Sequence, residues 1–141
     1  MKRLLLSLSI ALFSMLTMQA AKPVSLSEAD FSRLVSDYTK GYCGWSFKGK
    51  RPAVIDFYAD WCGPCRIIAP SIDSLATVYD GKVDFYKVNI DHCPDIARNF
   101  GVRSIPLLLF CPVGDYPQAI AGAYPGSEID AVIRYLFFPN K

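Results

Sequence analysis

An apolar segment followed at once by two closely spaced cysteines constrains this chain most strongly. Residues 53–59 are largely hydrophobic, as expected of a buried strand, and Cys62 and Cys65 follow with the spacing C-x-x-C. Gly63 and Pro64 separate the cysteines, and this pair favours the start of a helix. We therefore expect a strand, a sharp turn and a helix that begins at the first cysteine. Two cysteines one helical turn apart can alternate between a dithiol and a disulfide.

Zinc sites, haem-attachment sites and structural disulfides also use two such cysteines. Haem attachment requires a histidine directly after the second cysteine, and none follows Cys65. A four-ligand zinc site would need further ligands, and no second C-x-x-C supplies them. His92 is the only histidine of the chain, so we expect it at the surface. A disulfide across so short a loop would restrict the unfolded chain little, which argues against a purely stabilising role. The sequence therefore predicts a redox pair, with no metal and no cofactor.

Residues 1–20 have the layout of a secretory signal peptide. A basic start at residues 2–3 precedes an apolar stretch at residues 4–18, and Ala20 and Ala21 are small residues suited to cleavage. As a helix at ~1.5 Å per residue the apolar stretch would span ~22 Å, short of the ~30 Å hydrocarbon layer, so a retained anchor is the less favoured alternative. We expect removal of residues 1–20 and export to the periplasm.

The part of the chain after the signal peptide, residues 21–141, should form one domain. The whole chain is 52% hydrophobic, which is enough for a substantial core. Without residues 2–3, 13 basic and 13 acidic residues remain, so the charge gives no reason to expect nucleic acid or an anionic membrane as partner. We expect a monomer with no stable membrane insertion once the signal peptide is removed.

Hydrophobic periodicity predicts alternating helices and strands after residue 24. A helix capped by Ser27 should end at Gly41, and residues 41–52 should form an exposed loop or a short excursion anchored by aromatic residues. In chain order we then expect a strand at 53–59, a helix from Cys62 with Pro70 inside it, a strand at 83–90, a helix at 94–100, strands at 107–111 and 118–122, and a helix at 128–138, besides a possible short strand near Val24. This order predicts an α/β fold with a mixed sheet between helices.

Two motifs carry a family resemblance. The segment Asp56-Phe57-Tyr58-Ala59, with Trp-Cys-Gly-Pro-Cys at residues 61–65, resembles the active-site region of the thioredoxin family. Ser104-Ile105-Pro106, followed by an apolar strand, resembles the second signature of that family. The resemblance runs from about Val54 to Ile129 and implies a thioredoxin fold and thiol–disulfide exchange with protein substrates. Residues 41–52 are longer than the family pattern and read as an insertion.

The resemblance also implies the roles of four residues. Cys62 would attack a substrate disulfide and Cys65, expected to be more buried, would resolve the resulting mixed disulfide. A helix N-terminus should lower the pKa of the Cys62 thiol. Asp56 interrupts an apolar strand, so burial should raise its pKa, and the family role is that of a base for the resolving cysteine. Lys87 matches the lysine that pairs with this aspartate; an edge position for Asp56 and a surface position for Lys87 are the alternatives.

A substrate groove should adjoin the cysteines. A proline that opens a strand suits a cis peptide bond, because inside the ladder it would remove a donor; an ordinary trans turn is the alternative. In the family, an extended substrate pairs as an added strand beside this loop. The expected groove residues are Trp61, Gly63, Pro64, Ile105, Pro106 and Gly122.

Three further cysteines leave an odd count. Cys43 and Cys111 should lie at the pole away from the active site and could form a structural disulfide; a buried Cys111 thiol and an unpaired Cys43 are the alternative. Cys93 precedes Pro94 at an N-cap-like position and is either a bystander or a regulatory thiol.

The sequence thus favours an exported protein-disulfide reductase. The Gly-Pro centre and the buried Asp56 resemble reducing family members more than oxidising ones, and an exported reductant needs electrons from a membrane redox partner. The alternatives are a periplasmic disulfide oxidant or isomerase and, as a different class, a non-catalytic peptide-binding module. Metal carriage by the cysteine pair is less favoured, because neither Met nor His accompanies it.

Overall fold

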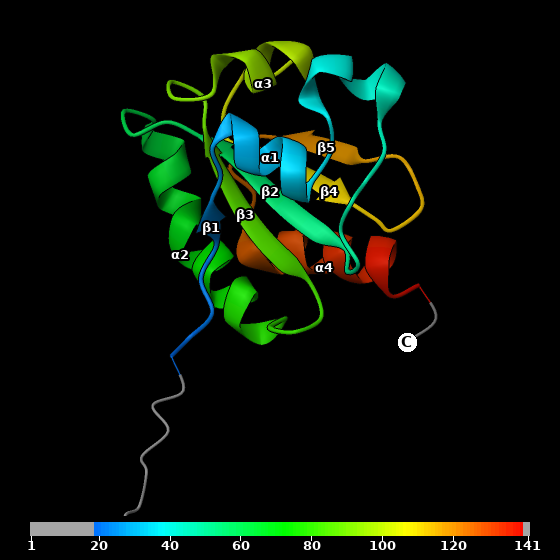
Figure 1. Ribbon diagram of the computed structural model, residues 1–141. Helices are drawn as coiled ribbons and strands as arrows, with labels where there is room; N and C mark the ends of the chain where they lie inside the picture. Colours follow the sequence, from blue (N-terminus) through cyan, green and yellow to red (C-terminus); the bar gives the residue numbers. More distant parts are fainter. Residues whose placement is uncertain (1–18, 140–141) are drawn as a thin grey trace, which may run out of the picture.

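A five-stranded mixed sheet lies at the centre of the computed structural model, which describes residues 19–139 (Figure 1). The strands are β1 (Val24–Ser25), β2 (Ala53–Tyr58), β3 (Asp84–Asn89), β4 (Leu107–Cys111) and β5 (Gln118–Ala121), in the spatial order β1-β3-β2-β4-β5. β2 is parallel to β3, which is parallel to β1, whereas β4 is antiparallel to both β2 and β5. The predicted mixed sheet is confirmed. The predicted signal peptide lies outside the described residues, except for its last two.

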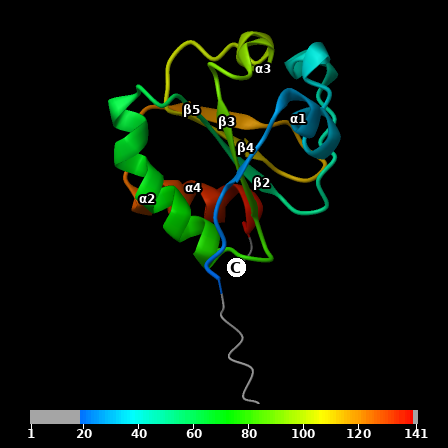
Figure 2. The same cartoon turned by 60° about the vertical axis from the view of Figure 1, so that its left-hand side comes forward.

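Helices cover both faces of the sheet, as predicted. The helices are α1 (Glu28–Leu34), α2 (Gly63–Val78), α3 (Pro94–Asn99) and α4 (Gly126–Phe137). α2 and α4 lie on one face, and α1 and α3 lie on the other (Figure 2). Side chains of β2 alternate between these layers, since Val54 packs in the cluster with α2 and α4 while Ile55 and Phe57 pack with α1 and α3. A central strand buried on both faces explains the continuous apolar run.

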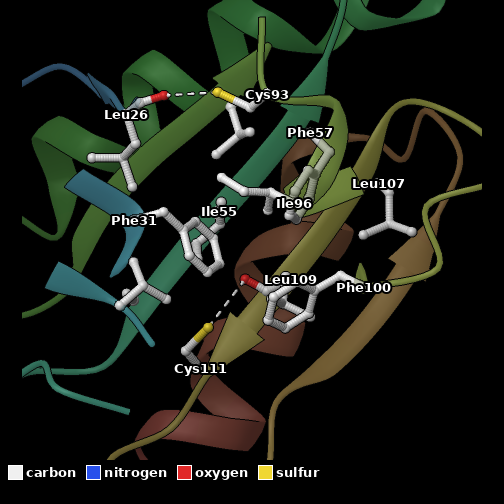
Figure 3. Packing of buried hydrophobic residues seen from close by; sticks show 13 residues of the cluster. Leu26, Phe31, Ile55, Phe57, Cys93, Ile96, Phe100, Leu107, Leu109 and Cys111 are labelled. Atoms are coloured by element: carbon white, nitrogen blue, oxygen red, sulfur yellow. Dashed lines mark hydrogen bonds between the residues drawn. The ribbon is translucent and has the colours of Figure 1, made fainter. Parts of the chain in front are cut away.

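The core on the α1 and α3 face is aromatic and tightly closed. Phe31 of α1, Ile55 and Phe57 of β2 and Ile96 of α3 are fully buried there (Figure 3). Phe100, directly after α3, packs its ring 5.4 Å from that of Phe31, centroid to centroid. Aromatic pairs at this separation stabilise a core beyond the area that they bury. This cluster ties both short helices to the sheet.

α1 ends earlier than the sequence suggested. Ser27 caps it as predicted, and the Ser27 and Asp30 side chains form a reciprocal capping box. The helix ends at Leu34 rather than at Gly41, so that part of the prediction was wrong. The Ser36 hydroxyl accepts a hydrogen bond from the Ser46 amide at 3.2 Å, and the Asp37 carboxylate accepts one from the Thr39 amide at 3.1 Å. Such local bonds compete with helix continuation, and the chain forms a 3₁₀ turn instead.

The predicted insertion, residues 41–52, is anchored by aromatic rings. Tyr42 and Trp45 place their rings edge-on to Phe100, with centroid separations of 5.1 and 5.8 Å, and Trp45 stacks on Phe47 at 6.0 Å. The Trp45 indole also donates a hydrogen bond to the backbone oxygen of Asp115 at 3.1 Å. The segment therefore packs on α3 and on the β4–β5 turn, which matches the aromatic-anchored alternative.

The proposed disulfide between Cys43 and Cys111 does not form. Cys43 is exposed with a free thiol, and Cys111 is fully buried with a free thiol on the α1 and α3 face of β4. Burial raises the pKa of Cys111 well above its usual value, so the thiol stays protonated and behaves as a small apolar group. The pairing hypothesis is therefore wrong, and the alternative of a buried Cys111 thiol with an unpaired Cys43 is confirmed, because β4 turns its last side chain into the core.

Cys93 is also part of the core rather than of the active site. It holds the N-cap position of α3, but its side chain makes no capping hydrogen bond. The thiol instead lies 3.5 Å from the backbone oxygen of Leu26 (Figure 3). Burial is the main cause that raises the pKa of this thiol, which disfavours the reactive thiolate. Its surroundings therefore suit the bystander interpretation.

The other element boundaries differ from the predicted ones by at most about two residues. β5 ends at Ala121 because Gly122 has a φ of 122°, a conformation that favours glycine and leaves the strand. Within residues 19–139, no helix is long and apolar enough to cross a bilayer.

Candidate active site

Cys62 and Cys65 lie at the junction between β2 and α2. They form a disulfide with an S–S distance of 2.10 Å and a Cα–Cα distance of 5.3 Å. Cys62 is the N-cap residue of α2, and its sulfur accepts a hydrogen bond from the Cys65 amide at 3.2 Å. The N-terminal end of a helix carries partial positive charge and free amide groups. After reduction, the same position favours a thiolate on Cys62, which is the reactive form in disulfide exchange.

The two cysteines are equally buried in the disulfide form. Each is 3% exposed, so the expected difference in burial is not seen. Ala59 completes this small cluster, and Ile105 packs against it from the loop before β4. Trp61 is 67% exposed beside them. The residue directly before the buried disulfide is therefore an exposed aromatic side chain.

Asp56 lies on the central strand, on the face covered by α2. It is 7% exposed, and one of its carboxylate oxygens, Oδ1, is buried with no hydrogen-bond partner among the described residues. Burial raises the pKa of Asp56 from 3.8 to about 6, while the positive charge of Lys87 opposes this shift. The edge-strand alternative for Asp56 is therefore wrong.

Lys87 is the register partner of Asp56. The two residues are paired across the parallel strands β2 and β3, and the Lys87 Nζ lies 5.6 Å from the centroid of the Tyr58 ring. Lys87 is half-buried rather than free in solvent. The structure thus brings the predicted acid–lysine pair together on one face of the sheet.

A cavity connects this pair to the second cysteine. Its volume is about 210 Å³, and Asp56, Cys65, Lys87 and Tyr58 are among the residues that line it. A cavity of this size with polar groups can hold water, through which a proton could pass between Cys65 and Asp56. Cys62 does not line this cavity, so the two cysteines have different surroundings despite equal burial.

The predicted groove residues come from the start of α2, the loop before β4 and the end of β5. The peptide bond between Ile105 and Pro106 is cis, as predicted. The Gly122 amide donates a hydrogen bond to the Pro106 carbonyl at 2.9 Å, which places Gly122 beside this loop. Gly63 is partly exposed and Pro64 is exposed at the start of α2. Ile105 packs against the two buried cysteines, and Trp61 and Pro64 are exposed next to them in the chain.

Sequence reasoning did not identify three contributors to the site. The Asp91 carboxylate accepts a hydrogen bond from the Trp61 indole at 2.8 Å and fixes that ring. Pro23 and Arg66 line the cavity that contains Asp56. Pro23 and Asp91 meet the site only through the tertiary arrangement, whereas Arg66 directly follows Cys65 but has no role in the motif that would have indicated a place in the cavity. Within the described part of the chain, no group of three or more His, Cys, Asp or Glu side chains is placed to hold a metal ion.

Comparison with known proteins finds a family match and relatives that cover most of the chain. The sequence matches the thioredoxin family model over residues 23–135. A thioredoxin of Borreliella burgdorferi is 43% identical over 114 residues, covering 81% of this chain and 97% of that protein. An M-type chloroplastic thioredoxin of Spinacia oleracea is 48% identical over 86 residues, covering 60% of this chain and 48% of that protein.

A third relative gives a similar match: Thioredoxin 1 of a Nostoc species is 40% identical over 83 residues, covering 59% of this chain and 78% of that protein. The chain thus spans nearly all of the Borreliella protein and about half of the Spinacia protein. Since the family match covers most of the chain and includes the disulfide at the start of α2, the chain belongs to the thioredoxin family of thiol–disulfide oxidoreductases.

Proposed function

We propose that this protein is an exported protein-disulfide reductase that works in the periplasm. The observation that carries the proposed reaction is the buried Asp56, which shares a cavity with Cys65. The reducing direction is proposed from the resemblance of the Gly63-Pro64 centre and Asp56 to reducing family members. To release its substrate, a reductase must convert its buried resolving thiol into a thiolate, and a nearby carboxylate with a raised pKa is suited to accept that proton. The role of Asp56 as base, with Lys87 as its charge partner, is part of the proposal.

The reaction consists of two exchanges. The Cys62 thiolate attacks one sulfur of a substrate disulfide, a Cys62–substrate bond forms, and the other substrate sulfur leaves as a thiolate. Cys65 then gives its proton to Asp56, and its sulfur attacks Cys62, which releases the second substrate sulfur. The enzyme ends with the Cys62–Cys65 disulfide, the form present in the structure. Two electrons pass from the enzyme dithiol to the substrate.

The proton affinity of Asp56 suits this task. With a pKa of about 6 the carboxyl is largely ionised at neutral pH, yet it is a stronger base than an ordinary aspartate. Lys87 keeps the ionised form accessible by opposing the effect of burial. We assign substrate binding to the groove formed by Trp61, Gly63, Pro64, Ile105, Pro106 and Gly122.

Export is proposed from the sequence of residues 1–20. Each turnover consumes two electrons, and a protein outside the cytoplasm has no access to the cytosolic thiol pool. We therefore infer a membrane redox partner that reduces the Cys62–Cys65 disulfide again. An oxidant would need the opposite arrangement, with a partner that removes electrons from the dithiol.

Cell fractionation with thiol trapping tests compartment and direction together. Cells are quenched with acid, free thiols are alkylated, and the redox state of the Cys62–Cys65 pair is measured in the periplasmic and cytoplasmic fractions. The proposal predicts a periplasmic protein held mainly as a dithiol. A periplasmic protein held as a disulfide would indicate an oxidant, and a cytoplasmic protein would contradict export. A Cys62→Ser variant that keeps full activity in cells would favour a non-catalytic peptide-binding module.

A further inference from the structure

The cavity that contains Asp56 has one wall from the N-terminal end of the described chain. Pro23 lines it, although this residue lies far from Asp56 in the sequence. We call residues 21–26 the N-terminal strap. In the structure it runs past α2 and then along β3 as the short edge strand β1 (Figure 1). One residue of the strap thus borders the cavity that contains the proposed proton path.

Three contacts hold the N-terminal strap in place. The Thr77 hydroxyl of α2 donates a hydrogen bond to the Ala21 carbonyl at 3.1 Å. Val24 pairs in parallel register with Tyr86 of β3. The Leu26 amide donates a hydrogen bond to the Lys87 carbonyl at 2.9 Å. Pro23 lies between the first and second of these contacts, so the chain on both sides of it is fixed to different elements.

The cavity that Pro23 borders is rich in charged side chains. The groups that share it with Asp56 are Lys87 from β3, Tyr58 from β2, Asp60 from the β2–α2 turn, and Cys65, Arg66 and Asp73 from α2. The Arg66 guanidinium donates a hydrogen bond to the Asp60 carbonyl at 2.8 Å. Burial, rather than any of these charges, is the leading cause of the raised pKa of Asp56. Any element that controls the entry of water therefore controls the strength of this base.

We propose that the N-terminal strap is a positioning element of the redox site, in which Thr77 pins Ala21 so that Pro23 closes the cavity around Asp56. Pro23 suits this place because its ring fills space and its nitrogen carries no N–H group that would need a partner. The consequence for the reaction rests on the proposed role of Asp56 as base for Cys65. Cleavage after Ala20, which the sequence predicts, would leave the strap complete, because its first anchored residue is Ala21.

Replacement of Thr77 by Val tests the strap, because it keeps the branched shape and removes only the hydroxyl. The pKa of the Asp56 carboxyl is measured by ¹³C NMR in the disulfide form, where Cys65 does not titrate. We expect water to enter and the pKa to fall by about one pH unit toward that of an exposed aspartate. The pH profile for the release step, measured as resolution of a mixed disulfide, should shift to lower pH by the same amount.

Ser74→Ala is the matched control. Thr77 also bonds to the Asp73 carbonyl within α2, and Ser74 makes the equivalent bond to the Pro70 carbonyl without touching the strap. Ser74→Ala should therefore leave the pKa of Asp56 unchanged. Pro23→Gly is a second test, since it opens the wall while the hydrogen bond from Thr77 remains.

The outcomes separate this inference from the proposed function. An Asp56 pKa that stays the same in both Thr77→Val and Pro23→Gly overturns the role of the strap. A lowered pKa without a matching shift of the pH profile supports the strap and contradicts Asp56 as the base. A lowered pKa with a matching shift supports both.

Discussion

At the scale of single residues, two cysteines with the same burial have different chemical surroundings. Cys62 receives the Cys65 amide hydrogen bond at the start of α2, whereas Cys65 borders the cavity that contains Asp56. The first environment stabilises a thiolate and the second supplies a proton acceptor. Because of this asymmetry, we expect replacement of Cys62 and replacement of Cys65 to block different steps of the reaction.

Replacement of Cys65 by Ser should trap substrates. Without a resolving thiol, the Cys62–substrate disulfide persists, so mixed disulfides accumulate and appear on non-reducing gels after alkylation. Cys62→Ser should trap nothing. Cys43→Ser, which removes an exposed free thiol away from the site, is the control and should behave as the unmodified protein. Equal trapping by Cys62→Ser and Cys65→Ser would contradict the assignment of the attacking thiol.

Asp56 should make the protein less stable as the pH rises. Below 3.8 the carboxyl is protonated in both the folded and unfolded chains, whereas above about 6 folding must bury a carboxylate. The free energy of unfolding should therefore fall as the pH rises between these values, by an amount on the order of 2–3 kcal/mol. Asp56→Asn should remove this dependence and be more stable at pH 8. Urea unfolding of both proteins at pH 4 and pH 8 measures it, and parallel pH dependences would contradict the buried-carboxylate account.

At the scale of elements, short helices depend on caps and on aromatic contacts. α1 has seven residues, and its first turn is held by the capping box of Ser27 and Asp30. Isolated helices of this length are not stable, so capping and packing must supply the stability. The same holds for residues 41–52, which rely on rings that pack against Phe100.

Ser27→Ala should lower the free energy of unfolding by ~1 kcal/mol, because the α1 amides lose their side-chain acceptor. Ser127→Ala is the matched control: Ser127 lies in the first turn of α4, where no side chain caps the helix. Chemical denaturation of both variants measures the difference. The same stability in both would contradict the capping account, and neither should change turnover.

Replacing each of the two tryptophans should affect a different property, stability for Trp45 and activity for Trp61. Trp45→Ala loses the stack on Phe47, the edge contact with Phe100 and the hydrogen bond to the Asp115 carbonyl, so unfolding should become easier by ~2 kcal/mol. Trp61→Ala removes an exposed ring beside the disulfide and should instead lower the rate of substrate reduction. Unfolding and reductase assays on both variants check this separation. A Trp45→Ala protein with normal stability would show that the insertion is not anchored as described.

The sequence was sufficient to predict those elements whose structure depends mainly on their own residues. The run at residues 53–59 predicted a doubly covered strand, and the spacing of Cys62 and Cys65 predicted the turn into α2. The early end of α1 could not be predicted, because Ser36 finds its partner in Ser46, in a segment whose path is set by Phe100. Those interactions depend on tertiary contacts that no window of sequence displays.

The candidate site shows the same division. Asp56 was predicted because a charged residue within an apolar strand is unusual. Pro23 and Asp91 were missed because both reach the site through contacts distant in sequence. Pro23 lines the cavity next to β1, and Asp91, after β3, accepts a hydrogen bond from Trp61, after β2. The error over Cys111 has a related cause: sequence placed it at the right pole of β4 but did not determine which way its side chain points.

At the scale of the whole molecule, the described chain begins on one side of the proposed proton path and the disulfide lies on the other. The N-terminal strap, the cavity and the start of α2 form one continuous region, which joins the end of the predicted signal peptide to the redox pair. Of the predicted groove residues, none lines this cavity.

The reduction potential of the Cys62–Cys65 pair distinguishes a disulfide reductase from a disulfide donor. The protein is equilibrated with glutathione and dithiothreitol buffers of known potential, and the dithiol fraction is read from alkylation. We expect a value close to the ~−270 mV known for thioredoxins, as a reductase requires. A value near ~−120 mV, typical of strongly oxidising disulfide donors, would contradict it and make the protein a source of disulfides.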